Sequence, residues 1–383
     1  MERSKNILIV AGEASGDLHA ANLAKALKEI NPNLRFFGIG GASMRNTDVE
    51  IYRDIKDFAV LGIFDVLKKL PRFIALKNLI LQKISEKRID ALVLVDFSGF
   101  NLRLAKKINK KIPTIYYISP QVWASRPGRI KTIKRYISKM IVILKFEEEF
   151  YKRYGINVDF VGHPLLDIVQ PTMEKKEFLD KFKLSESKIT IALLPGSRRQ
   201  EIENILPIML KASLLLQNKI KNIQFIVAKS PSVDYDVYNC KTSGFKIDLR
   251  IIEGKTYDCL AAADFCFVAS GTATLETAIM QKPFVIIYKM GLFNYLFYRP
   301  QVKVHYIGMV NILAGRKIVA EFIQFKADPK AISVQVLKIL ENPQEMERIK
   351  EDLAQIKSLL GEKGASLKAA RIIADFLNND LTH

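Results

Sequence analysis

The segment 270–276, which reads Ser-Gly-Thr-Ala-Thr-Leu-Glu, places a turn of small residues between an apolar run and a helical pattern. The first N–H groups of a helix lack partners and lie at the positive end of its dipole, so such a turn favours phosphate. Ser270, Gly271 and Thr272 are the predicted phosphate contacts, and Glu276 is placed to bind a ribose diol. The alternative is an ordinary strand–turn–helix with Ser270 as the N-cap.

A second turn of this kind follows the apolar run 188–195 and contains Gly196, Ser197 and Arg198. An arginine here could contact a phosphate with two parallel N–H donors, although a surface arginine is the simpler alternative. Two phosphate-type turns in one half of the chain are more specific than either alone. Together they predict a site for a nucleotide diphosphate.

Acidic residues follow two apolar runs in the first half of the chain. Asp96 ends the run 90–96, where a partly desolvated carboxylate could act as a general base or, alternatively, cap the next helix. The loop after the run 6–11 carries Glu13, Ser15, Gly16 and Asp17, which could contact an acceptor or serve packing only. The histidines and cysteines have no metal-ligand spacing, so no metal or cofactor is predicted.

Apolar runs alternate with helical patterns along the whole chain, which predicts an α/β fold of parallel sheets covered by helices. The series pauses near 164–170 and then restarts, so two Rossmann-like halves are expected, facing each other with their strand ends on one cleft. The predicted strands are 6–11, 35–39, 90–96, 113–118, 139–144, 158–161, 188–195, 222–228, 248–253, 263–269 and 283–288.

The charge of the chain is strongly positive. Over 383 residues the net charge is +19, and 14 Lys/Arg against 3 Asp/Glu lie between Asn101 and Arg153. Without a nucleic-acid-binding motif, an anionic ligand or membrane surface is the expected partner, and a lysine-rich solvated surface is the alternative. No apolar run reaches the roughly 18–20 residues that a membrane span needs, which predicts a cytoplasmic protein, soluble or peripheral.

The segment 57–75 has large apolar residues at helical spacing with basic neighbours. It is either core or an amphipathic helix that contacts lipid, as is the aromatic segment 289–306. The predicted lipid or membrane contacts are Leu61, Phe64, Leu67, Lys68, Lys69 and Arg72.

Taken in order, these motifs resemble those of the lipid-A-disaccharide synthases, inverting glycosyltransferases of GT-B type. The matching stretches are GEASGD (12–17), GIGG (38–41), VLGIFDVLKKLP (60–71), FNLRLA (100–105), YYISPQVWAS (116–125), VGHP (161–164), LLPGSRRQEI (193–202), SGTATLE (270–276) and NILAGR (311–316). The combination of GEASGD, SPQVWA and LLPGSR is highly specific.

The resemblance implies an acceptor domain over 1–166, a UDP-sugar domain over 167–345 and C-terminal helices over 346–383 that return to an N-terminal domain, its own or that of a swapped homodimer. It implies UDP-2,3-diacylglucosamine as donor and 2,3-diacylglucosamine 1-phosphate as acceptor, joined β-1,6 at the cytoplasmic face of the inner membrane without a metal. By motif, Asp96 matches the family's essential aspartate, and Arg198, Glu276 and Asn311 match its UDP site. This chain departs from the family at Gly99, where a second acidic residue is common.

Two other functions fit parts of the pattern. A UDP-sugar 2-epimerase shares the nucleotide-binding domains but acts on soluble sugars and needs no apolar surface at 57–75. A non-enzymatic basic membrane-binding protein would account for the charge but not for the two phosphate-type turns.

Overall fold

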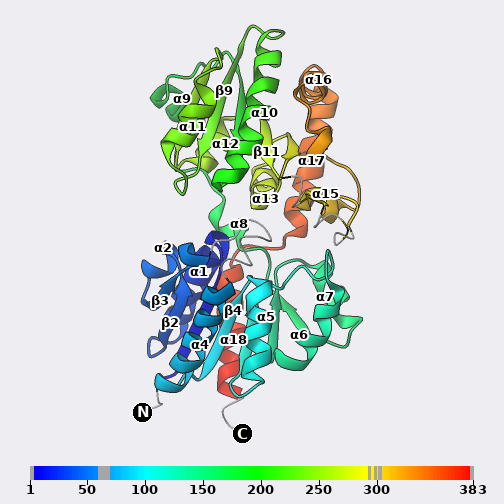
Figure 1. Ribbon diagram of the computed structural model, residues 1–383. Helices are drawn as coiled ribbons and strands as arrows, with labels where there is room; N and C mark the ends of the chain where they lie inside the picture. The colour runs from blue at the N-terminus through cyan, green and yellow to red at the C-terminus, as the bar shows by residue number, and fades with distance from the viewer. Residues whose placement is uncertain (1–3, 59–69, 292–294, 297–299, 301–303, 380–383) are drawn as a thin grey trace. The chain divides into compact units, whose positions relative to one another are not determined.

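The computed structural model describes residues 4–58, 70–291, 295–296, 300 and 304–379. The chain forms two compact units (Figure 1). The first contains residues up to Pro164 and the C-terminal segment from Leu360, and the second contains the chain between them apart from 301–303. Each unit is built on a parallel sheet, which confirms the predicted α/β class.

The first unit has a seven-stranded sheet in the order β3-β2-β1-β4-β5-β6-β7. Its strands are β1 (Asn6–Ala11), β2 (Arg35–Gly40), β3 (Val49–Asp54), β4 (Ala91–Val95), β5 (Thr114–Tyr117), β6 (Lys139–Val142) and β7 (Val158–Phe160). Its helices are α1 (Ala14–Ile30), α2 (Ala42–Arg45), η1 (Ile55–Phe58), α4 (Leu70–Glu86), α5 (Ser98–Ile108), η2 (Pro127–Arg129), α6 (Ile130–Tyr136), α7 (Phe146–Lys152) and α18 (Ala365–Asn379).

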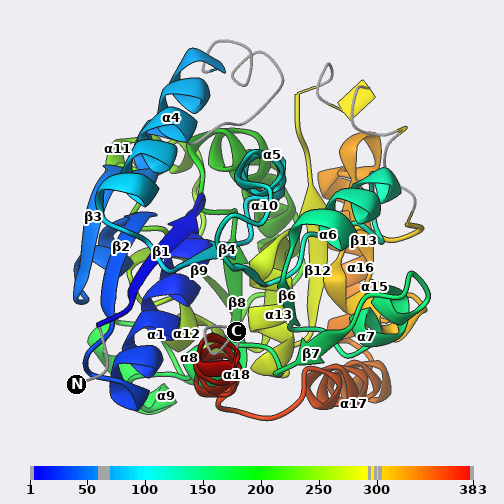
Figure 2. The ribbon, with the colours of Figure 1, turned by 90° about the horizontal axis from the view of Figure 1, so that it is seen from below.

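Helices cover both faces of this sheet, so its central strands are buried on both sides and are continuous apolar runs. Figure 2 shows α4, α5 and α6 over one face, and α1 and α18 side by side over the other. The last helix of the chain therefore completes the layer that the first helix begins.

The second unit has a six-stranded sheet in the order β10-β9-β8-β11-β12-β13. Its strands are β8 (Ile189–Leu194), β9 (Ile223–Lys229), β10 (Leu249–Glu253), β11 (Phe265–Ala269), β12 (Phe284–Tyr288) and β13 (Glu321–Ile323). Its helices are α8 (Leu165–Ile168), α9 (Lys175–Lys181), α10 (Arg199–Gln217), α11 (Tyr235–Thr242), α12 (Thr256–Ala262), α13 (Thr272–Ile279), α15 (Met309–Ala314), η4 (Gln324–Lys326), α16 (Pro329–Leu340) and α17 (Pro343–Leu359).

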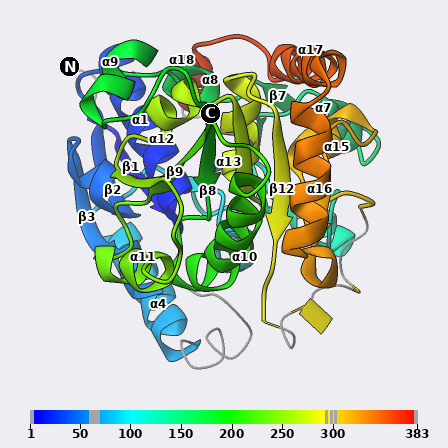
Figure 3. The ribbon, with the colours of Figure 1, turned by 90° about the horizontal axis from the view of Figure 1, so that it is seen from above.

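Helices pack on both faces of the second sheet as well. Figure 3 shows α10 with α11 and α16 beside it on one face, and α9, α12 and α13 on the other. Helix α17 packs against α13 within this unit. The predicted C-terminal segment 346–383 is therefore divided, because most of α17 belongs to it but packs in the second unit, whereas α18 packs in the first.

All the predicted strands are present, and two further strands were not predicted. Strand β3 alternates apolar and charged residues (Val-Glu-Ile-Tyr-Arg-Asp), and β13 has only three residues. Both lie at an edge of their sheet, where burial on one side is enough and no continuous apolar run is required.

Candidate functional site

Each sheet has one point at which the strand order reverses, and the predicted functional turns lie there. In the first unit β1 pairs with β4, so the loop with Glu13 and the turn with Asp96 follow neighbouring strands. In the second unit β8 pairs with β11, so the turns beginning at Gly196 and Ser270 are also neighbours. Open α/β sheets bind ligands at the carboxyl ends of the strands at such a switch point.

Helix α1 begins at Ala14, so of the predicted loop residues Ser15, Gly16 and Asp17 lie in its first turn, where Asp17 has a packing role. Its buried carboxylate accepts hydrogen bonds from the N–H groups of Gly41 (2.6 Å), Ser43 (2.8 Å) and Met44 (3.2 Å), at the start of α2. A Cβ atom on Gly41 would lie 2.9 Å from Asp17 Oδ2, so this close approach requires glycine. Of the other predicted loop residues, Glu13 is exposed, Ser15 is half-buried and Gly16 is buried.

Asp96 lies directly after β4, in a turn with an unusual backbone. Asp96 and Phe97 both have φ of 48°, in the left-handed region that non-glycine residues avoid. The Asp96 carbonyl accepts hydrogen bonds from Asn101 Nδ2 (2.9 Å) and from the Tyr116 hydroxyl. The Phe97 ring lies over Gly12, where a Cβ atom would come within 2.0 Å of the ring. These contacts hold the turn, and a Cβ atom added to Gly16 would lie 3.9 Å from Asp96 Cβ.

In the second unit the turn before α13 keeps open N–H groups. Gly271, the N-cap of α13, has φ of 148°, and a Cβ atom added to it would meet no other atom within 4 Å. Within the described chain, the backbone N–H groups of Thr272 and Ala273 have no hydrogen-bond partner. Gly271 and Thr272 are exposed, and the Ser270 hydroxyl donates to the Ile307 carbonyl at 3.4 Å. This turn retains the donors that phosphate needs.

Glu276 lies one turn into α13 and is held by a residue that was not predicted from the sequence. The Tyr257 hydroxyl, from α12, donates to Glu276 Oε1 at 3.1 Å. Burial raises the pKa of Glu276 above its ordinary value, and the hydrogen bond from Tyr257 lowers it. Burial also raises the pKa of Tyr257, so the phenol keeps its proton and can act as the donor.

The turn after β8 differs from the prediction, because its N–H groups are already bonded within the unit. Glu201 Oε2 accepts from the N–H groups of Ser197 (3.0 Å) and Arg198 (3.2 Å), and Arg198 Nη1 donates to Glu201 Oε1 at 3.2 Å. Gly196 has φ of 114° and fits closely under the Glu201 side chain. What this turn can offer a phosphate is the partly exposed guanidinium of Arg198. A glutamate at the third helical position was the available signal.

Asn311 has an internal role in this structure. Its amide nitrogen donates to the Val319 carbonyl (3.0 Å) and to Glu321 (2.9 Å), and its oxygen accepts from the N–H groups of Ile318 (2.8 Å) and Val319 (3.1 Å). The side chain is fully buried. Because both ends of the amide are occupied, Asn311 shapes the segment around α15 and does not present its side chain to a ligand.

The predicted lipid contacts Leu61, Phe64, Leu67, Lys68 and Lys69 lie outside the described residues, as does part of 289–306. Arg72 is described; it is exposed near the start of α4 and lines a cavity of about 380 Å³ with Arg53 and Asp57.

No helix in the described part of the chain is both long and apolar enough to cross a membrane. The described residues also contain no cluster of three or more histidine, cysteine or carboxylate side chains arranged to hold a metal ion.

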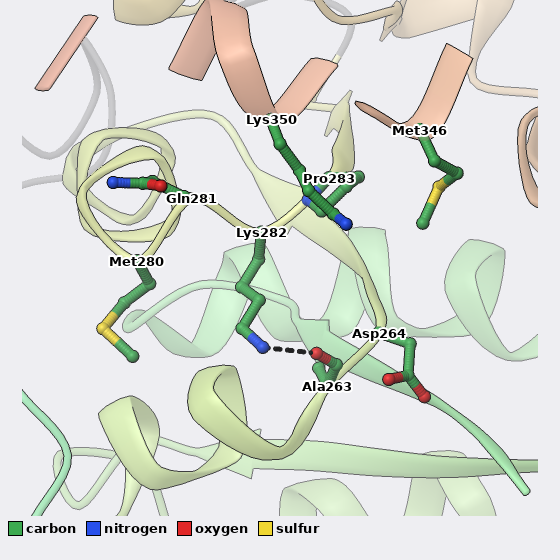
Figure 4. Close-up of a pocket in the computed structure, with 8 residues that line it drawn as sticks. All are labelled: Ala263, Asp264, Met280, Gln281, Lys282, Pro283, Met346 and Lys350. Carbon is green, nitrogen blue, oxygen red and sulfur yellow. Dashed lines mark hydrogen bonds between the residues drawn. The ribbon is translucent and has the colours of Figure 1, made fainter. Parts of the chain in front are cut away.

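Another cavity, of about 260 Å³, lies in the second unit at the amino-terminal ends of strands β11 and β12 (Figure 4). It is lined by Asp264 and Pro283, which precede β11 and β12, and by Lys282. Lys282 Nζ donates to the carbonyls of Ala261 (2.8 Å) and Ala263 (2.9 Å). The cavity is therefore away from the carboxyl ends of the strands, and its lysine joins α12 to the start of β12.

Sequence comparison decides between the functions that this geometry allows. The family model described as lipid-A-disaccharide synthetase matches residues 7–376. The chain belongs to the lipid-A-disaccharide synthase family. A lipid-A-disaccharide synthase of Syntrophus aciditrophicus is 43% identical over 96% of each chain, and one of Myxococcus xanthus is 38% identical over 98% of this chain and 99% of its own. The chain is therefore a glycosyltransferase of lipid A biosynthesis, and its family implies a UDP-sugar donor and a lipid acceptor.

Solved structures agree on the fold. A kitacinnamycin glycosyltransferase aligns with a TM-score of 0.64 at 13% identity, covering 97% of this chain and 99% of its own. A UDP-GlcNAc 2-epimerase from Neisseria meningitidis, bound to UDP-GlcNAc, aligns with a TM-score of 0.63 at 12% identity, covering 98% of this chain and 100% of its own. This confirms the GT-B type of fold, which synthases and epimerases share, so the fold alone does not separate the two activities.

Proposed function

We propose that this chain transfers the sugar of UDP-2,3-diacylglucosamine to the 6-hydroxyl of 2,3-diacylglucosamine 1-phosphate. The product is a β-1,6 disaccharide, formed with inversion, and UDP is released. The observation that most supports the proposal is the placement of Asp96 in a strained turn at the switch point of the first sheet, in a chain of this family.

The donor is assigned to the second unit. The N–H groups of Thr272 and Ala273 bind the diphosphate at the start of α13, because they have no other partner in the described chain. The Glu276 carboxylate accepts from the ribose hydroxyls, and the Arg198 guanidinium neutralises phosphate charge. The N–H groups of Ser197 and Arg198 are not assigned to the ligand, because Glu201 occupies them.

The chemical step needs one base and one stabilised leaving group. Asp96 accepts the proton of the acceptor 6-hydroxyl as its oxygen attacks the anomeric carbon of the donor. The bond from that carbon to the UDP oxygen breaks at the same time, so a single in-line displacement inverts the configuration. Arg198 and the start of α13 stabilise the negative charge that develops on UDP.

The proposal includes no metal ion and no further cofactor, because Arg198 and the helix N-terminus supply the positive charge for the departing UDP. Activity should therefore survive an excess of EDTA. A strict requirement for added Mg²⁺ would contradict this part of the proposal.

We also propose that the protein acts peripherally at the cytoplasmic face of the inner membrane. Both proposed substrates carry acyl chains, and a net charge of +19 favours an anionic surface.

Helix α18 packs on α1 of its own chain, and the same contact made with a second copy would give the swapped homodimer. Nucleic acid is not a proposed partner.

The deciding experiment is incubation of the purified protein with UDP-2,3-diacylglucosamine and 2,3-diacylglucosamine 1-phosphate in detergent. Mass spectrometry should detect the disaccharide 1-phosphate together with equimolar UDP, and neither should form when either substrate is left out. The competing epimerase activity predicts conversion of a UDP-sugar in the absence of any acceptor. Epimerised UDP-sugar without disaccharide would reject the proposal.

A further inference from the structure

Arg129 lies close to Asp96 in the first unit and has no role in the reaction as proposed above. Its guanidinium Nη1 donates to the Ser98 hydroxyl at 2.8 Å, and Ser98 opens α5 two residues after Asp96. Arg129 also interacts electrostatically with Tyr116, whose hydroxyl donates to the Asp96 carbonyl. The cation therefore lies at the carboxyl end of β4, beside the proposed base.

The surroundings of Arg129 are unfavourable for a positive charge. Its side chain is half-buried, and within the described chain it forms no ion pair. Burial lowers the pKa of Arg129, the charges of Arg126 and Arg103 lower it further, and only the Tyr116 hydroxyl acts in the opposite sense. Like charges that lie near one another disfavour each other's charged form.

The position that follows Ser98 carries no side chain. Gly99 follows Ser98, and a Cβ atom added there would meet nothing within 4 Å. Gly99 therefore adds no side chain next to Ser98, the hydrogen-bond partner of Arg129.

We propose that Arg129, together with Arg103 and Arg126, binds the phosphate group of the sugar acceptor beside Asp96. This inference rests on the proposed function and deepens it by naming the part of the acceptor that the first unit recognises. The planar guanidinium matches a phosphate with two parallel N–H donors. In the acceptor, C1 with its phosphate and C5 with its hydroxymethyl group both flank the ring oxygen. Fixing the phosphate at Arg129 therefore brings the 6-hydroxyl near the neighbouring carboxylate.

The test compares two acceptors, 2,3-diacylglucosamine 1-phosphate and the same lipid without the phosphate. Wild type should prefer the phosphorylated acceptor in kcat/KM by about 10- to 100-fold, the worth of one charge-assisted contact. Arg129→Met should lose most of this preference, because kcat/KM should fall for the phosphorylated acceptor and stay the same for the acceptor without phosphate. The KM for the UDP donor should be unchanged. Arg129→Lys, which keeps the charge but not the fork, should lie between them. Lys131→Met, an exposed cation on α6, is the matched control and should keep the full preference.

Different outcomes of these measurements would assign Arg129 to the UDP donor or to lipid headgroups, or would reject the site. A full preference in Arg129→Met, or an equal loss on both acceptors, overturns the proposal. A weaker affinity for UDP instead would assign Arg129 to the donor, and release from vesicles of anionic phospholipid with the preference intact would assign it to lipid headgroups. Inorganic phosphate should inhibit wild type competitively with the phosphorylated acceptor and inhibit Arg129→Met less. If Arg129→Met does not fold, Arg126→Met must reduce the preference, and an unchanged value there also overturns the proposal. If wild type converts neither acceptor, the proposed function has failed and not this site alone.

Discussion

The backbone at Asp96 and Phe97 is the most strained point near the proposed chemistry. Each left-handed non-glycine residue costs on the order of 1–3 kcal/mol, and the surrounding structure has to hold it in place. Here Asn101 and Tyr116 bind the Asp96 carbonyl, and Phe97 is wedged against Gly12. These contacts hold the backbone of the residue that we propose as the general base.

Asp96→Asn should remove turnover and leave the nucleotide site intact. Asparagine keeps the size of the side chain and suits a left-handed backbone, so the fold should be preserved. Loss of a general base typically lowers the rate by ~10²–10⁴-fold. Steady-state turnover and UDP calorimetry on the same preparation check this. Turnover close to that of wild type in folded protein would reject the role of Asp96 as the base.

Tyr257→Phe should weaken UDP binding in a pH-dependent way. In the proposed donor site the ionised Glu276 carboxylate accepts from the ribose hydroxyls, so UDP affinity should fall as the pH drops through the pKa of Glu276. The Tyr257 hydrogen bond lowers that pKa, and its removal raises it. The acid limb of the UDP affinity profile should therefore move to higher pH in Tyr257→Phe. Calorimetry from pH 5 to pH 8, repeated with 2′-deoxy-UDP, checks this, because the deoxy ligand should discriminate less between variant and wild type.

At the scale of elements, Glu147 joins α7 to the loop 118–125 through a buried carboxylate. It accepts from Trp123 Nε1 at 3.2 Å and from the Ser119 hydroxyl, and its exposed fraction is 2%. Burial raises the pKa of Glu147 from 4.5 to about 7. Between these two pH values the unfolded chain releases the proton and the folded chain keeps it, so stability falls as the pH rises through this window.

Glu147→Gln should remove this pH dependence. The shift from 4.5 to about 7 corresponds to roughly 3 kcal/mol, fully lost above the folded pKa. Relative to wild type, the variant should therefore be more stable at pH 8 than at pH 5. Urea unfolding at both pH values measures the difference. A stability difference that is the same at both would show that Glu147 titrates normally.

The return of the chain to the first unit depends on close backbone packing at Gly162. Gly162 has φ of 88°, and a Cβ atom there would lie 2.8 Å from the Glu362 carbonyl oxygen. Gly162→Ala should destabilise the first unit by about 2–4 kcal/mol, from the left-handed backbone and the clash together. Gly364→Ala is the matched control, because Gly364 has φ of 89° with open space and should cost only about 1–2 kcal/mol. Equal losses in thermal or urea unfolding would rule out the contact as the cause.

The sequence predicts the elements and turns that depend on local patterns. Buried parallel strands are visible as apolar runs, and the turns of the candidate site follow the ends of those runs. The strand order that makes these turns neighbours was not predicted. The half-polar β3 and the very short β13 have no such run. The partnerships of Tyr257 with Glu276 and of Asn101 with the Asp96 carbonyl depend on side-chain direction, which spacing does not give. Asn311 was assigned to the UDP site by its match to the family motif, which does not show that its amide is bonded within the second unit.

At the scale of the whole molecule, the net positive charge predicts binding to anionic membranes. Each basic residue near an anionic surface contributes about 1 kcal/mol, and the contribution fades with salt. Binding to anionic vesicles should therefore weaken between low and high salt. Replacing Leu61, Phe64 and Leu67 with serine should release the protein further, since each buried apolar side chain adds roughly 1.5–3 kcal/mol.

Vesicle flotation measures this binding, and UDP affinity is the control that should not change. Those three residues lie outside the described part of the chain, so the assignment is made from the sequence. Unchanged flotation of the triple variant, or its unfolding, would assign the segment to the core instead.

The two points where the chain leaves and re-enters the first unit are neighbours. The His163 N–H donates to the Leu360 carbonyl at 2.8 Å, and a Cβ atom on Gly361 would lie 3.2 Å from Gly162 Cα. In the described chain the second unit is thus a single insertion within the first. During synthesis it can complete its own core while the first unit still lacks α18, the partner of α1. The first unit is therefore the first to be synthesised in part and the last to be completed.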